Sequence, residues 1–120
     1  GGLVLEVKAS RDGRHLLMQA EGGRIHLWDV AEQRVVGEFT GHRQGRYMLH
    51  ATFGGRDDAF VASGSEDSRV HIWNRATGSV VAVLPGHSGT VSAVAWNPAD
   101  PHVLATASDD RTVRVWGLRV

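Results

Sequence analysis

The sequence contains no cysteine, which excludes disulfide bonds and thiolate metal sites and fits a reducing compartment such as the cytosol or nucleus. It has no excess of either charge: thirteen basic residues balance thirteen acidic ones, so nothing favours binding to nucleic acid or to an anionic membrane. No apolar run is long enough to cross a bilayer or to form a signal peptide. We therefore expect a cytoplasmic or nuclear protein that binds partners through local shape.

What the sequence does have is an internal repeat. Three segments end in an apolar residue followed by tryptophan, at Trp28, Trp73 and Trp116, with spacings of 45 and 43 residues. The dipeptide Gly41-His42 recurs as Gly86-His87, again 45 residues further on. Two unrelated landmarks with one period indicate three copies of one structural unit.

Short apolar runs alternate with turn residues between these landmarks, at lengths typical of β-strands. Pro98, Pro101 and the acidic turn at Asp109-Asp110 break the pattern where strands should end. The expected strands cover residues 3–9, 15–19, 24–28, 34–39, 48–53, 60–63, 69–73, 79–84, 91–96, 103–107 and 112–116. The repeats therefore predict units at 1–40, 41–85 and 86–120, of which the last lacks its outer strand.

This pattern resembles the WD-repeat family, whose repeats of about 40–45 residues carry Gly-His near the start and Trp-Asp near the end. Trp28-Asp29 keeps the literal dipeptide, and the other two repeats have Trp-Asn and Trp-Gly. The resemblance implies an all-β propeller fragment of about three four-stranded antiparallel blades, whose ring this chain alone does not close. From this, and from a start at Gly1-Gly2-Leu3 without methionine, we expect a piece of a longer chain. Its partners then include the rest of its propeller or another copy.

A histidine, a hydroxyl and a carboxylate occur together in two repeats and suggest a hydrolytic triad. They are His42, Ser63 and Asp67 in the second repeat and His87, Thr106 and Asp110 in the third. A duplicated triad with a threonine substitute favours structure over catalysis. The resemblance implies a structural relay, in which aspartate accepts from histidine, histidine contacts the hydroxyl, and the hydroxyl accepts the indole N–H of Trp73 or Trp116. We expect no catalytic residue.

The first repeat has Met18 and Gly22 at the hydroxyl and aspartate positions. The relay should be absent there, and the first blade should be the least rigid. His26 and His71 each precede a tryptophan by two residues, but no carboxylate is spaced to complete a metal site, so solvated or half-buried strand positions are expected. The pairs Gly22-Gly23 and Gly54-Gly55 are interpreted as turns, because neither opens a phosphate-binding helix. We expect no metal and no cofactor.

Acidic residues precede the aspartate position in all three repeats, and the resemblance places them on one rim. These candidates for partner binding are Glu21, Glu66 and Asp109. Arg43, Arg46 and Tyr47, which follow His42, are further candidates because arginine and tyrosine are enriched at interface hot spots. The alternative for both sets is an ordinary solvated loop.

The stretch Phe53-Gly54-Gly55 is the part of the sequence that is least typical of WD repeats in general. With Trp96-Asn97-Pro98 and the closing strand it is similar to the C-terminal blades of the WD repeat-containing protein 26 type, a group of CTLH/GID ubiquitin ligase subunits. That resemblance implies a non-catalytic scaffold or substrate-recruiting role, with ligase subunits and substrates as partners. Alternatives are a generic WD-repeat adaptor in signalling or chromatin complexes and an enzyme built on a propeller. The Trp-Asp-x-Arg motif of direct cullin-4 adaptor docking is not matched, because Val30 and Ala31 follow Asp29.

Overall fold

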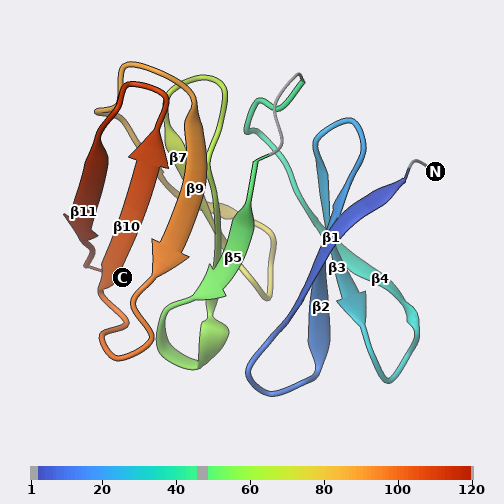
Figure 1. Cartoon of the computed structure of the whole chain (residues 1–120). Helices are drawn as coiled ribbons and strands as arrows, with labels where there is room; N and C mark the ends of the chain where they lie inside the picture. Colours follow the sequence, from blue (N-terminus) through green and yellow to red (C-terminus); the bar gives the residue numbers. More distant parts are fainter. Residues whose placement is uncertain (1–2, 46–48, 120) are drawn as a thin grey trace.

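The computed structural model describes residues 3–45 and 49–119 of the chain. They form three antiparallel sheets that follow one another along the chain (Figure 1). The sheets have the strand orders β1-β2-β3-β4, β5-β6-β7-β8 and β9-β10-β11. The expected all-β architecture of about three blades, with no ring closed by this chain, is confirmed.

All eleven expected strands are present, and every end except the start of β5 lies within one residue of its expected position. Their bounds are β1 Val4–Ala9, β2 His15–Ala20, β3 Arg24–Asp29, β4 Arg34–Phe39, β5 Ala51–Gly54, β6 Phe60–Ser63, β7 Val70–Asn74, β8 Val80–Leu84, β9 Val91–Trp96, β10 Val103–Ser108 and β11 Val113–Gly117. The largest difference is β5, which begins at Ala51, three residues later than expected. The helical content of the described residues is one 3-10 turn, η1, at Arg56–Asp58.

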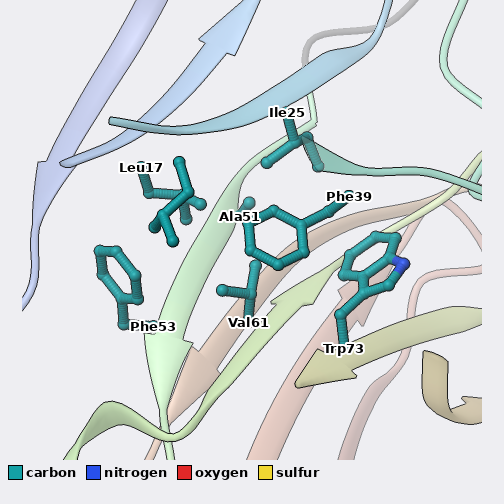
Figure 2. Packing of buried hydrophobic residues seen from close by; sticks show 8 residues of the cluster. Leu17, Ile25, Phe39, Ala51, Phe53, Val61 and Trp73 are labelled. Atoms are coloured by element: carbon teal, nitrogen blue, oxygen red, sulfur yellow. The ribbon is translucent and has the colours of Figure 1, made fainter. Parts of the chain in front are cut away.

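The first core lies between the first two sheets (Figure 2). Alternating residues of β2 and β3 point into it, as expected for strands with period two. Phe39 lies against Trp73 with the ring centroids 5.8 Å apart, and both side chains are almost fully buried. The other members of this cluster are Leu17, Ile25, Leu27, Ala51, Phe53 and Val61.

The second core joins the second and third sheets, so the middle sheet is covered on both faces. Strand β7 is consequently buried at four of its five residues. Burial on two faces fits its sequence, in which the apolar residues Val70, Ile72 and Trp73 do not alternate strictly with polar ones. This cluster contains Ala62, Val70, Ile72, Val91, Val94, Trp96 and Leu104.

Two glycines of the middle sheet permit this close packing. A Cβ at Gly54 would lie 2.1 Å from the Trp96 ring, and one at Gly64 would lie 1.9 Å from the carbonyl oxygen of Val91. The interpretation of Gly54 as a turn glycine is therefore wrong: it ends strand β5 and leaves room for an indole. Gly55, with a φ of 79°, does make the turn.

The outer faces of the first and third sheets carry exposed apolar side chains. Val113 and Val115 of β11 are each 71% exposed, and Val4 and Val7 of β1 are each 50% exposed. An apolar sheet face of this kind normally packs against a neighbour. No helix among the described residues is long and apolar enough to cross a membrane.

Candidate functional site

The third sheet brings together all four residues expected there as a relay. The Nδ1 atom of His87 lies 2.9 Å from an Asp110 carboxylate oxygen, and its Nε2 atom lies 2.8 Å from the Thr106 hydroxyl. The indole N–H of Trp116 donates to the same hydroxyl at 2.9 Å. These distances give a continuous chain of hydrogen bonds from the outer strand to the turn that follows β10.

The chain of donors has one consistent direction. Because the Asp110 carboxylate only accepts, His87 donates from Nδ1 and accepts the Thr106 O–H at Nε2, which leaves the hydroxyl oxygen free for the indole. The Thr112 hydroxyl, then the backbone N–H groups of Ser88 and Thr112, donate to Asp110 and hold its pKa well below the usual value. The relay thus ends on a firmly ionised carboxylate.

This arrangement has the connectivity of a hydrolytic triad but not its accessibility. Thr106 is 2% exposed and His87 is 7% exposed, so a substrate carbonyl has no path to the hydroxyl. The hydroxyl oxygen also accepts the Trp116 N–H, which occupies one of its two lone pairs. Its chemistry is therefore that of a structural lock.

The second sheet does not form the relay expected from the sequence. Asp67 contacts His71 Nε2 at 3.0 Å and not His42, while Ser63 donates to the carbonyl oxygen of Gly64. Trp73 donates its indole N–H to the carbonyl oxygen of Thr40, 2.8 Å away. The prediction was wrong because the imidazole of His71, on β7, binds the Asp67 carboxylate in place of His42. The third sheet has Arg114 at the position of His71, and there the carboxylate of Asp110 is bound by His87.

His42 is left beside the relay, packed edge-on against Trp73 with the ring centroids 5.5 Å apart. Neither imidazole nitrogen has a hydrogen-bond partner among the described residues. Burial, and secondly the nearby His71, lower the pKa of His42 below its usual value. His71 is itself buried, which corrects the expectation that it is a solvated or half-buried position, whereas His26 is half-buried as expected.

The first sheet has no relay, and a different polar lock joins it to the second. The Gln19 side-chain amide donates to the carbonyl oxygen of Leu49 and accepts the backbone N–H of Ala51, at 2.5 and 3.0 Å. Gln19 is 2% exposed and sits on the same strand face as Leu17. The sequence analysis missed this residue, although a lone glutamine on an apolar strand face was a usable signal.

A second missed residue, Arg75, joins the same two sheets at their other end. Its guanidinium contacts Asp12 at 3.1 Å and His15 Nδ1 at 2.6 Å, and lies 5.4 Å from the centre of the Phe53 ring. The Ser10 hydroxyl, then the Arg14 N–H and Arg75, hold the pKa of Asp12 well below its usual value. Nothing in the sequence marked Arg75, because its partners lie in another repeat.

The acidic candidates for partner binding lie in the turns that join the second and third strands of each sheet. Glu21 and Asp109 are exposed, while Glu66 is half-buried and accepts the backbone N–H of Gly45 at 2.6 Å. Arg43 is exposed and its backbone N–H donates to the Ser65 hydroxyl. Arg46 and Tyr47 lie outside the described residues.

The described residues contain no group of three or more histidine, aspartate or glutamate side chains placed to hold a metal ion. Apart from the imidazole of His42, the polar groups described above bond to one another or to the backbone. They position strands and turns, and they leave the exposed turns and the cavities between sheets as the surfaces that can meet another molecule.

Comparison with known proteins gives a consistent result. The family model described as WD domain, G-beta repeat matches residues 33–74 and 78–117. A WD repeat-containing protein WDS homolog from Arabidopsis thaliana is 47% identical over 95% of this chain and 22% of its own length. The GID complex subunit 7 of Schizosaccharomyces pombe is 43% identical over 94% of this chain and 22% of its own length. A WD repeat-containing protein 26 homolog from Drosophila melanogaster is 46% identical over 87% of this chain and 16% of its own length. The chain spans about a fifth of the length of the curated relatives it matches.

Proposed function

The chain belongs to the WD domain, G-beta repeat family, and from this premise we propose that it is a non-catalytic protein-interaction scaffold of a GID-type complex. The observation that carries the proposal is the likeness, over most of the chain, to relatives named GID complex subunit 7 and WD repeat-containing protein 26 homolog. In such a complex it would form the propeller part of a scaffold or substrate-recruiting subunit of an E3 ubiquitin ligase, in the cytoplasm or nucleus.

The internal chemistry supports a binding role and not a catalytic one. The hydroxyl, imidazole and carboxylate groups of the relay in the third sheet are hydrogen-bonded to one another, and Thr106 and His87 are buried. A scaffold needs rigid sheets that hold exposed turns in fixed positions, and the relay and the Gln19 contact supply that rigidity.

The exposed acidic turns are the surface we propose for a partner. Glu21 and Asp109 project from matching turns of the first and third sheets, and Glu66 lies in the corresponding turn between them. A basic protein surface that spans several sheets would meet a carboxylate on each. Because these charges are exposed, they would contribute mainly to the rate and specificity of association.

Affinity purification of the intact chain, followed by mass spectrometry, tests the proposal. We expect GID-type ligase subunits among the recovered proteins, while complexes without such subunits would favour a signalling or chromatin adaptor. The double variant Glu21→Lys and Asp109→Lys should lose a partner that binds the acidic turns. The control Glu32→Lys changes an exposed carboxylate at the other end of the first sheet and should lose none.

A further inference from the structure

A cavity of about 530 Å³ lies where the first turns of all three sheets meet. The turn after β1 contributes Arg11, the end of β5 and the turn after it contribute Gly54 and residues 55–58, and the turn after β9 contributes Asn97, Pro98 and Pro101. The stretch Phe53-Gly54-Gly55, which belongs neither to the relay nor to the acidic turns, lines this cavity. The cavity is a property of the assembled sheets, because no single sheet supplies its wall.

One part of the wall is apolar. Phe53 and Trp96 line it, and both are mostly buried by their neighbours. The Trp96 ring stacks on Phe60 with the centroids 6.0 Å apart, and its N–H donates to the carbonyl oxygen of Pro101 at 2.9 Å. Since this N–H is already used, the indole offers a ligand only apolar contact.

The rim carries two arginines whose charges are not used inside the molecule. Arg11 and Arg56 are exposed, and neither guanidinium has a hydrogen bond or ion pair with another described residue. Lys8 also lines the cavity, but its Nζ atom donates to the carbonyl oxygen of Ala51 at 2.7 Å. The two arginines line a cavity whose wall is partly polar and partly apolar, which is an arrangement suited to a carboxylate next to an apolar side chain.

The two carboxylates at the cavity do not neutralise the arginines. Asp58 is 6% exposed and accepts the backbone N–H of Arg11 at 2.7 Å, so its charge is directed into the protein. Asp57 is exposed on the rim. Three basic and two acidic residues line the cavity, and Lys8 also pairs with Glu6 at 3.6 Å, so Arg11 and Arg56 supply the positive charge that a ligand can reach.

The backbone of the wall is held in an unusual conformation. Asp57 and Asp58 have φ angles of 56° and 54°, a left-handed region that non-glycine residues seldom adopt. The Asp58 contact with Arg11 and the two weak contacts of Arg75 Nη1 with the carbonyl oxygens of Asp57 and Asp58 hold this turn in place. The rim is thus preorganised, which lowers the entropic cost of binding.

We propose that this cavity binds a short peptide segment of a partner protein, in which an aspartate or glutamate is adjacent to an aromatic or aliphatic residue. The apolar side chain lies against Phe53 and Trp96, and the carboxylate lies between Arg11 and Arg56. The proposal rests on the proposed function only in that the chain works by binding proteins. A nucleic acid fits less well, because two free guanidinium groups offer few phosphate contacts and no net charge attracts a polyanion.

Selection from a phage-displayed random heptapeptide library against the intact chain tests the proposal without knowledge of the partner. We expect enriched peptides to pair an acidic residue with a neighbouring aromatic or aliphatic one. The most enriched peptide, labelled with fluorescein, is then titrated by fluorescence polarisation. Replacing its acidic residue by the matching amide should weaken binding about tenfold. No enrichment, or enrichment of basic or uncharged peptides, would overturn the proposal.

Variants of the rim connect the peptide to this cavity. Arg11→Glu with Arg56→Glu should abolish binding of the labelled peptide, while Arg11→Lys with Arg56→Lys should retain most of it. The control Arg24→Glu makes the same type of substitution at one exposed residue away from the cavity and should have no effect. Near-ultraviolet circular dichroism checks that each variant is folded. Unchanged binding in the doubly reversed variant would show that the peptide binds elsewhere.

Two competitors separate the proposed ligand from a simple anion site. Inorganic phosphate and a single-stranded oligothymidine should each fail to displace the labelled peptide, and displacement by either would contradict a peptide site. Recovery of ligase subunits with the unsubstituted chain is measured in parallel with its peptide binding. Subunits recovered without peptide binding would refute the cavity proposal alone, whereas peptide binding without subunits would refute the proposed complex.

Discussion

Trp116 donates its indole N–H to the Thr106 hydroxyl, whereas Trp73, at the matching position of the second sheet, donates to the backbone carbonyl oxygen of Thr40. The same residue type in the same strand of two repeats is therefore satisfied in two different ways. The carboxylates differ in the same way: Asp67 in the second sheet is bound by His71, whereas Asp110 in the third sheet is bound by His87.

Removing the Thr106 hydroxyl should destabilise the protein. In Thr106→Val the N–H of Trp116 and Nε2 of His87 lose their partner inside the protein, at a cost of about 1–3 kcal/mol in the free energy of unfolding. Thr106→Ser keeps the hydroxyl and should lose less. Ser63→Ala is the matched control in the second sheet, where the hydroxyl bonds only to the adjacent Gly64, and urea unfolding should show the smaller loss there. Equal losses at both positions would contradict this assignment.

Adding a methyl group at Gly54 should disturb the contact between the second and third sheets. A Cβ there would lie 2.1 Å from the Trp96 ring, so the indole must move, and overpacking of this kind costs about 1–3 kcal/mol. Gly117→Ala is the control, since no atom lies within 4 Å of its added Cβ. Thermal unfolding followed by tryptophan fluorescence measures both variants. A Gly54→Ala protein as stable as the parent would show that the ring has another position.

Replacing Gln19 should loosen the inner edge of the second sheet. Gln19→Leu removes the acceptor of the Ala51 N–H and the donor to the Leu49 carbonyl oxygen, both in a buried environment. Hydrogen exchange should become faster at the Ala51 amide, while the amides inside the first sheet keep their protection. If the Ala51 amide stays protected, another group accepts its hydrogen.

The first sheet should be less rigid than the third, because Met18 and Gly22 replace the hydroxyl and aspartate of the relay that joins β10 and β11. We expect its amides in β2 and β3 to exchange faster than those of β10 and β11, which the relay joins. Hydrogen exchange monitored by mass spectrometry compares the two sheets in one experiment. Better protection in the first sheet would contradict the prediction.

Stability should decrease as the pH falls through the range in which histidine titrates. Burial lowers the pKa of His42 in the folded protein, so the unfolded chain binds its proton at a higher pH. The stability that the neutral imidazole gives is therefore complete above about pH 6.5 and is lost as the pH falls below it. His42→Gln should reduce the slope of unfolding free energy between about pH 7.5 and 5.5.

His102→Gln is the control for the pH dependence, because this side chain is exposed. His15, whose pKa is also lowered by burial, should supply part of the slope that remains. An unchanged slope in His42→Gln would show that the imidazole is not desolvated in the folded protein.

The sequence alone determined the fold class, the number of sheets and nearly all strand limits, because short apolar runs between turn residues can satisfy their backbone only as antiparallel strands. It also named the four members of the relay in the third sheet, since they lie within one repeat. The limits of the units at residues 40/41 and 85/86 stay a prediction.

Only the tertiary structure decided what happens between repeats. Gln19 meets Ala51, Arg75 meets Asp12, and Gly54 meets Trp96 across sheet boundaries, and each pair is far apart in the sequence. The partner of Asp67 likewise depends on packing: His71 contacts its carboxylate at 3.0 Å, whereas His42 packs edge-on against Trp73. A repeat pattern specifies the contacts inside one unit, whereas the polar locks and the cavity depend on how each sheet lies against the next.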